Sequence, residues 1–238
     1  MKKILFALLV LPLAAHAAVG HVKLDHAPID TRDAASIQRG VRVFVNYCLN
    51  CHSAQYMRYN RLLALGLTEQ QIRDNLMFGG GKLGDTMTVA MRKSDAKQWF
   101  GVAPPDLSVV ARSRGADWLY TYFRSYYRDD QTVTGWNNVV FPNVAMPHVL
   151  WELQGQQALE VKKEEGGHAA SELVLEHPGT MSRVEYDRLV ADLVNYLVFM
   201  AEPERATRVR LGYLVLIALG VLFVLFYLLK REYWKDVH

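Results

Sequence analysis

Cysteine is scarce in this sequence of 238 residues, occurring only as Cys48 and Cys51. A zinc site needs four ligands, and neither a second cysteine pair nor a His-x-His cluster is present to complete one. A thioredoxin-like redox pair would require a βαβ context, which the flanking residues do not offer. If both thiols are used in other covalent bonds, no disulfide is left to stabilise the chain.

A strong excess of either charge is also missing. The 27 basic and 24 acidic residues give a formal net charge of +3. Without Lys2, Lys3 and everything after Pro203, 19 basic residues face 21 acidic ones. We therefore expect no nucleic-acid partner. A central domain with so small an acidic excess is only a weak indication of a basic protein partner.

The two cysteines belong to the sequence Cys48-Leu49-Asn50-Cys51-His52. Cys-x-x-Cys-His is the attachment signal of c-type haem. Each thiol adds to one vinyl group of the porphyrin, and the short loop between them fits the distance between the vinyls. The following histidine then becomes the proximal iron ligand. The motif predicts one covalent haem c, bound through Cys48, Cys51 and His52.

Long apolar runs are confined to the two ends of the chain. Residues 1–18 are typical of a cleaved secretory signal, with two lysines, an apolar centre over residues 4–13 and a small-x-small cleavage site. Residues 211–229 are nineteen residues without a charge, close to the roughly twenty that span a bilayer. Basic residues flank both sides of this span, so the positive-inside rule does not decide its orientation. Export of the N-terminus predicts that the residues after the span lie in the cytoplasm.

These segments predict three parts of the chain. Residues 1–18 form the signal peptide, and residues 19–204 form a c-type haem domain in the periplasm. Residues 205–238 form a single-pass anchor in the bacterial inner membrane with a short cytoplasmic tail.

Apolar periodicity predicts a mainly α fold: a cytochrome c-type haem domain with long loop insertions, plus one C-terminal transmembrane helix. Helices are expected over residues 33–48, within 56–75 with a capping-box start at Thr68, and over 117–127. A further helix begins at the capping box of Ser182 and Glu185, ends before Pro203 and is expected to cross the first. Residues 154–180 are expected to form a solvated loop with a short hairpin near 172–176.

The glycine-rich residues 78–85 lack the full spacing of a phosphate loop, so nucleotide binding is excluded and a tight turn or a close approach to a flat cofactor is expected. Residues 103–108 contain Pro104 and Pro105, which are rigid and leave their carbonyls free to accept hydrogen bonds. A proximal histidine needs such a bond to its second ring nitrogen. We expect the Pro105 carbonyl to accept it from His52. The alternative is an ordinary surface turn.

Arg112 and Arg114 follow this loop. Haem has two propionates, and arginine pairs with carboxylates by bidentate hydrogen bonds. One of the two arginines is therefore expected to bind a propionate, and the other to be an ordinary surface charge.

The sixth iron ligand is expected to be Met146, which lies in an apolar segment without helical period between Pro142 and Pro147. A stiff loop can hold a thioether at the iron, whereas a methionine inside a helix usually fills a core. His148 is the alternative ligand. The separation of 94 residues from His52 to Met146 predicts an insertion between the two halves of the haem pocket.

Together these segments resemble the cytochrome c1 family, the haem subunits of cytochrome bc1 complexes. The specific part is the block at residues 180–182 and 201–204 before a terminal span, because free cytochromes c do not end this way. The resemblance implies His52 and Met146 as axial ligands and Arg114 as the propionate partner. The other segments that support it are Arg39-Gly40 before the haem motif, residues 104–108, Arg112 with Arg114, and Phe141-Pro142 before Met146.

The resemblance also implies a function. The chain would accept one electron from a Rieske iron–sulfur protein and pass it to a cytochrome c acceptor, with cytochrome b as its membrane neighbour in a dimeric respiratory complex. It would be part of an enzyme only as a subunit of ubiquinol–cytochrome c reductase. The alternatives are a stand-alone membrane-tethered cytochrome c that shuttles electrons between complexes, and a haem enzyme or gas sensor with an open sixth site.

Overall fold

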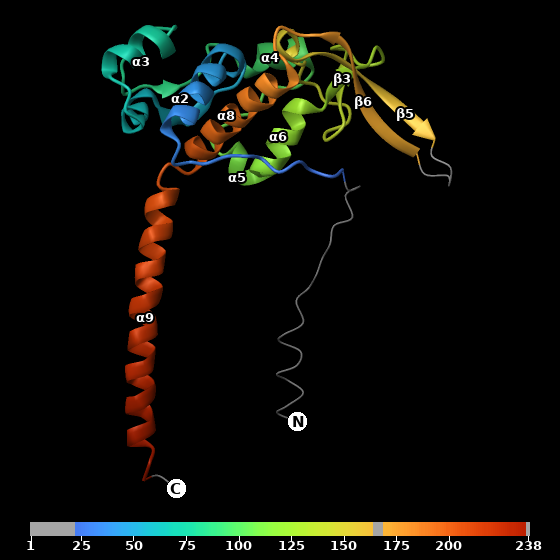
Figure 1. The fold of residues 1–238 in the computed structure, drawn as a ribbon. Coiled ribbons are helices and arrows are strands. Elements are labelled where there is room, and N and C mark those ends of the chain that lie inside the picture. The colour runs from blue at the N-terminus through green and yellow to red at the C-terminus, as the bar shows by residue number, and fades with distance from the viewer. Residues whose placement is uncertain (1–21, 164–168, 237–238) are drawn as a thin grey trace.

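The computed structural model describes residues 22–163 and 169–236, so the predicted signal peptide lies outside the described part. Over these ranges, short helices and three two-stranded antiparallel sheets form a head, from which one long helix extends (Figure 1). The predicted mainly α class with one C-terminal membrane-spanning helix is confirmed.

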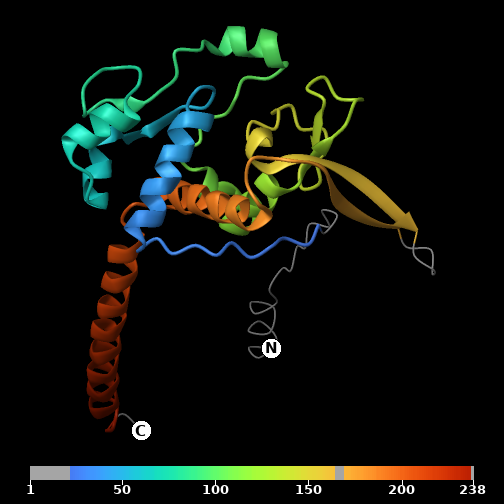
Figure 2. The same cartoon turned by 45° about the horizontal axis from the view of Figure 1, so that its top comes forward.

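The first and last helices of the head are at the centre of its core. The predicted helix before the haem motif consists of α2 (Ala34–Val43) and η1 (Phe44–Cys48), a π-helical turn, and Asp33 caps its start. The second is α8 (Arg183–Ala201), whose predicted capping box between Ser182 and Glu185 is present. Figure 2 shows the two helices crossing, as expected.

The two helices approach closely at Gly40. A Cβ atom on this glycine would lie 2.0 Å from the Asp192 carbonyl oxygen and 2.7 Å from Tyr196 Cβ. The Asp192 side chain is buried at the same contact and accepts hydrogen bonds from Ser36 Oγ at 2.7 Å and Arg39 Nε at 2.6 Å. These bonds compensate the desolvation of a buried carboxylate.

The second predicted helix, within residues 56–75, is shorter than expected. Only α3 (Glu69–Leu76) is α-helical there, and it begins at the predicted capping box of Thr68. The preceding residues form β1 (Ala54–Arg58) and the 3-10 helix η2 (Tyr59–Leu65). The strand forms because it pairs with β2 (Thr86–Met87), a contact that the local pattern does not reveal. The glycine-rich residues between α3 and β2 make an exposed turn, in which Gly80 and Gly81 have positive φ.

The middle of the chain contains α4 (Lys93–Phe100), α5 (Val110–Arg114) and α6 (Ala116–Arg124). The predicted aromatic helix ends three residues early, because β3 (Tyr126–Arg128) pairs with β4 (Trp136–Asn138). Beneath α5 and α6 runs an extended N-terminal segment (Figure 1). Its Asp25 and Ala27 donate backbone hydrogen bonds of 2.8 Å to side chains of α6.

The expectation for residues 154–180, a solvated loop with a short hairpin near 172–176, was right about a hairpin but wrong about its length. After the short helix α7 (Trp151–Gln154), the chain forms a long hairpin of β5 (Gly155–Lys163) and β6 (Ala169–Pro178) that extends away from the head (Figure 2). The polar composition misled the prediction, because a two-stranded hairpin needs no continuous apolar face where both sides meet water.

The long helix α9 (Arg205–Tyr233) includes the candidate membrane span Thr207–Tyr233, which contains the predicted residues 211–229. Three residues separate it from α8, and one of them is Pro203. Glu202 at this junction forms ion pairs with Arg112 of α5 at 3.3 Å and with Arg208 of α9 at 3.0 Å. The junction therefore connects the head and the long helix through a short link with ionic contacts.

Replacing Gly40 by alanine tests the helix crossing. The added methyl group would overlap the backbone of α8, so the free energy of unfolding should fall by about 1–3 kcal/mol. Gly84→Ala is the matched control, because nothing lies within 4 Å of its added Cβ. Thermal unfolding of the full chain in detergent should separate the two variants. Equal midpoints would contradict the close contact.

Candidate functional site

The Cys-x-x-Cys-His motif begins at Cys48, the last residue of η1. The backbone N–H groups of Cys51 and His52 both donate to the Cys48 carbonyl oxygen, at 3.1 Å and 2.8 Å, so the motif turns back on itself. Burial raises the pKa of the Cys48 thiol to about 12 and also raises that of Cys51. Reactive redox cysteines have a lowered pKa. The environment therefore disfavours a redox pair.

The imidazole of His52 is oriented by one backbone carbonyl. Its Nδ1 lies 2.8 Å from the Pro105 carbonyl oxygen, the contact expected from sequence. As an acceptor, this oxygen places the proton on Nδ1 and leaves Nε2 with its lone pair. No hydrogen-bond partner of Nε2 occurs among residues 22–163 and 169–236. Burial lowers the pKa of His52, so the ring is neutral, as a metal ligand must be.

The loop that carries Pro105 is fixed to the residues after the haem motif. The Asp106 carboxylate accepts hydrogen bonds from the backbone N–H groups of Gln55 and Ser108, both at 2.9 Å. The Leu107 N–H donates to the Ser53 carbonyl oxygen at 2.8 Å. The hydrogen bonds of Asp106 and Leu107 thus hold the Pro105 carbonyl next to His52.

An apolar cleft brings together Cys51, His52, Pro105 and Met146, four of the six predicted site residues. Cys48 is buried in the core next to it and does not line the cleft. The donor set suits a c-type haem, since a neutral imidazole and a thioether face one apolar space that also contains a cysteine of the motif. The other lining residues are Tyr47, Phe100, Val102, Pro104, Ala145, Pro147 and Val149.

His148, the alternative ligand, does not line this cleft. It is 2% exposed, and its ring stacks on Tyr126 with centroids 4.7 Å apart and contacts the ring of Trp136 edge-on at 5.1 Å. Burial lowers the pKa of His148 to about 4, so the ring is neutral in the core. Its surroundings are those of a packing residue, which favours Met146 as the ligand.

Two tyrosines that sequence reasoning missed contact Met146. Tyr122 Oη lies 3.5 Å from Met146 Sδ, and Tyr126 Oη lies 3.4 Å from the Met146 carbonyl oxygen. Burial raises the pKa of Tyr122 to about 12 and also raises that of Tyr126, so both hydroxyls are protonated. The four-residue spacing from Trp118 to Tyr122 is a signal for this cluster, since such residues share a helix face.

The Met146 segment also depends on two buried asparagines of β4. The Asn137 side-chain oxygen accepts from the Asn143 N–H at 2.8 Å, where the chain adopts a φ of 60°. The Asn138 side-chain oxygen accepts from the Val140 and Phe141 N–H groups at 2.9 Å and 3.1 Å. These bonds supply the rigidity that the two prolines alone were expected to give.

The two arginines differ in their partners. Arg112 pairs with Glu202, as described above. The Arg114 guanidinium lies over the rings of Trp118 and Phe141, at 5.0 Å and 5.7 Å from their centroids. Within the described ranges no carboxylate pairs with Arg114, so this arginine is the one available to an external anion. It does not line the cleft of His52 and Met146.

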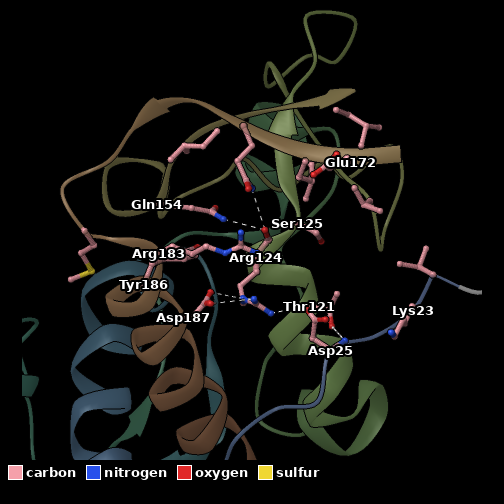
Figure 3. A pocket seen from close by; sticks show the side chains of 17 residues that line it. Lys23, Asp25, Thr121, Arg124, Ser125, Gln154, Glu172, Arg183, Tyr186 and Asp187 are labelled. Atoms are coloured by element: carbon pink, nitrogen blue, oxygen red, sulfur yellow. Dashed lines mark hydrogen bonds and ion pairs between the residues drawn. The ribbon is translucent and has the colours of Figure 1, made fainter. Parts of the chain in front are cut away.

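A larger cavity lies between the start of α8, α6 and the β5–β6 hairpin (Figure 3). Its central cation, Arg124, is already engaged. The guanidinium donates to Asp187 and to Asp25, each at 2.6 Å, and lies over the ring of Tyr120. None of the predicted site residues lines this cavity. Its residues join the N-terminal segment to the head.

Replacing Asp106 by alanine tests how the Pro105 loop is fixed. Loss of two acceptor contacts should destabilise the loop by about 1–2 kcal/mol and speed amide hydrogen exchange at Gln55 and Ser108. Asp130→Ala is the control, because the Asp130 side chain is 93% exposed and, within the described part of the chain, its ion pair is with Arg128. Unchanged exchange at both amides in Asp106→Ala would show that other contacts hold the loop.

Comparisons with known proteins agree with this geometry. The sequence profile of the Cytochrome C1 family matches residues 25–237. A protein of Nitrosomonas europaea named ammonia monooxygenase gamma subunit is 53% identical, over 100% of this chain and 99% of its own. The cytochrome c1 of Allochromatium vinosum is 51% identical over 100% of both chains. The mitochondrial cytochrome c1 heme protein of Saccharomyces cerevisiae is 26% identical over 89% of this chain and 70% of its own. Because the family profile matches most of its length and a cytochrome c1 is 51% identical over all of it, the chain belongs to the cytochrome c1 family.

Proposed function

We propose that the chain is the haem subunit of a cytochrome bc1 complex, which accepts one electron from a Rieske iron–sulfur protein and passes it to a cytochrome c acceptor. The observation that supports this most is the apolar cleft in which His52 and Met146 lie together, with His52 Nδ1 already bonded to Pro105. Such a ligand pair leaves no open site for substrate, so the site is suited to electron transfer.

In this proposal a bound haem c supplies a one-electron iron couple. Cys48 and Cys51 would hold the cofactor covalently, and His52 and Met146 would bind its iron. The Pro105 carbonyl fixes the tautomer and the plane of the imidazole. Apolar lining residues such as Phe100 and Val149 keep water away from the site, which helps to set its potential.

Arg114 is proposed as the propionate partner. Its guanidinium is placed by aromatic faces rather than by a carboxylate, so its hydrogen-bond donors remain available to an anion. Arg112 is instead engaged with Glu202.

The wider organisation is proposed from the sequence segments. Residues 1–18 are a signal peptide, residues 19–204 form a periplasmic haem domain, and residues 205–238 form the anchor and cytoplasmic tail in the bacterial inner membrane. Cytochrome b would be the membrane neighbour of α9 in a dimeric complex. As a subunit of that reductase the chain takes part in quinol oxidation, and its own proposed contribution is electron transfer alone.

Purification in mild detergent tests membership of the complex. A tagged full-length chain should co-elute with a b-type haem protein and an iron–sulfur protein. Elution as a lone cytochrome would instead support a membrane-tethered shuttle. Co-elution with a monooxygenase would instead indicate a monooxygenase subunit, as the name of the Nitrosomonas relative suggests.

Replacing Met146 by leucine tests the ligand assignment. Loss of the thioether should abolish the low-spin spectrum, lower the midpoint potential strongly and allow carbon monoxide to bind the reduced protein. Met87→Leu is the matched control, since Met87 is also buried with a tyrosine hydroxyl on its sulfur, at 3.3 Å, but lies outside the cleft. A Met146→Leu protein with an unchanged midpoint potential would show that another group is the ligand.

A further inference from the structure

Two buried tyrosine hydroxyls share contacts with Met146. Their oxygen atoms, on Tyr122 and Tyr126, are 2.5 Å apart. Tyr122 Oη is also within reach of Met146 Sδ, and Tyr126 Oη within reach of the Met146 carbonyl oxygen. The two residues are only 7% and 1% exposed. Each hydroxyl therefore depends on the other and on Met146 for its hydrogen bonds.

Counting protons shows that these three contacts cannot all be hydrogen bonds at once. Each hydroxyl donates one proton. If Tyr126 donates to Tyr122, then Tyr122 donates to the thioether sulfur. If Tyr122 donates to Tyr126, then Tyr126 donates to the carbonyl oxygen and the sulfur receives nothing. Donation by both to Met146 would leave two oxygen atoms 2.5 Å apart with no proton between them, which is repulsive.

Both tyrosine rings are held in place, so the two hydrogen-bond arrangements differ only in the directions of the hydroxyl protons. Tyr122 stacks on Trp118 with centroids 4.8 Å apart and an interplanar angle of 12°. Tyr126 stacks on His148 at an angle of 5°. The Tyr122 carbonyl oxygen also accepts a hydrogen bond of 2.8 Å from Asn138. Because packing holds the rings, only the two hydroxyl groups remain free to rotate.

We propose that Tyr122 is a positioning residue that tunes the electron donation of Met146 through a hydrogen bond to its sulfur, and that Tyr126 controls how often this bond forms. The inference rests on the proposed function, because it takes Met146 as an axial ligand. A hydrogen bond to the thioether withdraws electron density from sulfur. The sulfur then stabilises an oxidised metal less, and the midpoint potential rises.

The test compares Tyr122→Phe with Tyr126→Phe in the full chain within its membrane complex, by redox titration of the visible spectrum. Tyr122→Phe removes the bond to sulfur, so the equilibrium constant for reduction by a reference couple should fall three- to tenfold. A tenfold change corresponds to about 59 mV for a one-electron couple. Tyr126→Phe removes the competing acceptor of the Tyr122 proton, so the potential should stay at or above that of the wild type.

A merely structural role would move both variants in the same direction, since each loses one buried hydroxyl. A lower potential in both, or an unchanged potential in Tyr122→Phe, overturns the inference. Tyr196→Phe is the matched control, because it removes a buried hydroxyl bonded to the sulfur of Met87, and it should leave the potential unchanged.

The wild-type spectrum separates the two levels of the proposal. If it lacks thioether ligation, the assignment of Met146 in the proposed function fails. If thioether ligation is present and Tyr122→Phe keeps the wild-type potential, only the tuning role fails. Should Tyr122→Phe not fold, 3-fluorotyrosine at position 122, a stronger donor of similar size, must raise the potential. No rise would overturn the inference.

Discussion

The close contact between α2 and α8 is the constraint on which the head depends. Gly40 lets the two backbones approach, and the buried carboxylate of Asp192 at the same place is compensated by Ser36 and Arg39. An uncompensated charge there would cost several kcal/mol. Because α2 continues into η1, this contact also fixes where Cys48 emerges from the core and hence where His52 lies. The position of the haem motif is thus set by helix packing as well as by its own spacing.

The two sides of the cleft are made of loops rather than helices, and each loop has its own anchors. Asp106 ties the Pro105 loop to residues that directly follow the haem motif. Asn137 and Asn138 hold the Met146 segment through backbone N–H groups. These side-chain acceptors, exposed at Asp106 and buried at Asn137 and Asn138, satisfy backbone N–H groups that have no partner in a helix or sheet. The prolines limit the conformations of the loops, while these bonds select one of them.

Local patterns predicted the parts of the fold that local physics determines. The capping boxes at Thr68 and Ser182, the stripe that ends at Cys48 and the terminal apolar run are all present in the structure. The short strand β1 was missed and the hairpin β5–β6 was expected to be much shorter, because strand pairing depends on partners distant in sequence or on polar faces without periodicity. For the site, the proximity of His52 and Pro105 was predicted from the hydrogen-bonding need of a ligating imidazole. The contacts of Tyr122 and Tyr126 with Met146 were not, since they depend on how the end of α6 and the start of β3 meet a loop about twenty residues later.

The link between α8 and α9 has a mechanical consequence. Three residues can extend over no more than about 10 Å, and Pro203 stiffens them further. Glu202 restrains the joint through its pairs with Arg112 and Arg208. The short link thus limits how far the head can move independently of α9. The position of the cleft relative to α9 is therefore limited by the length of this link and by the ion pairs of Glu202.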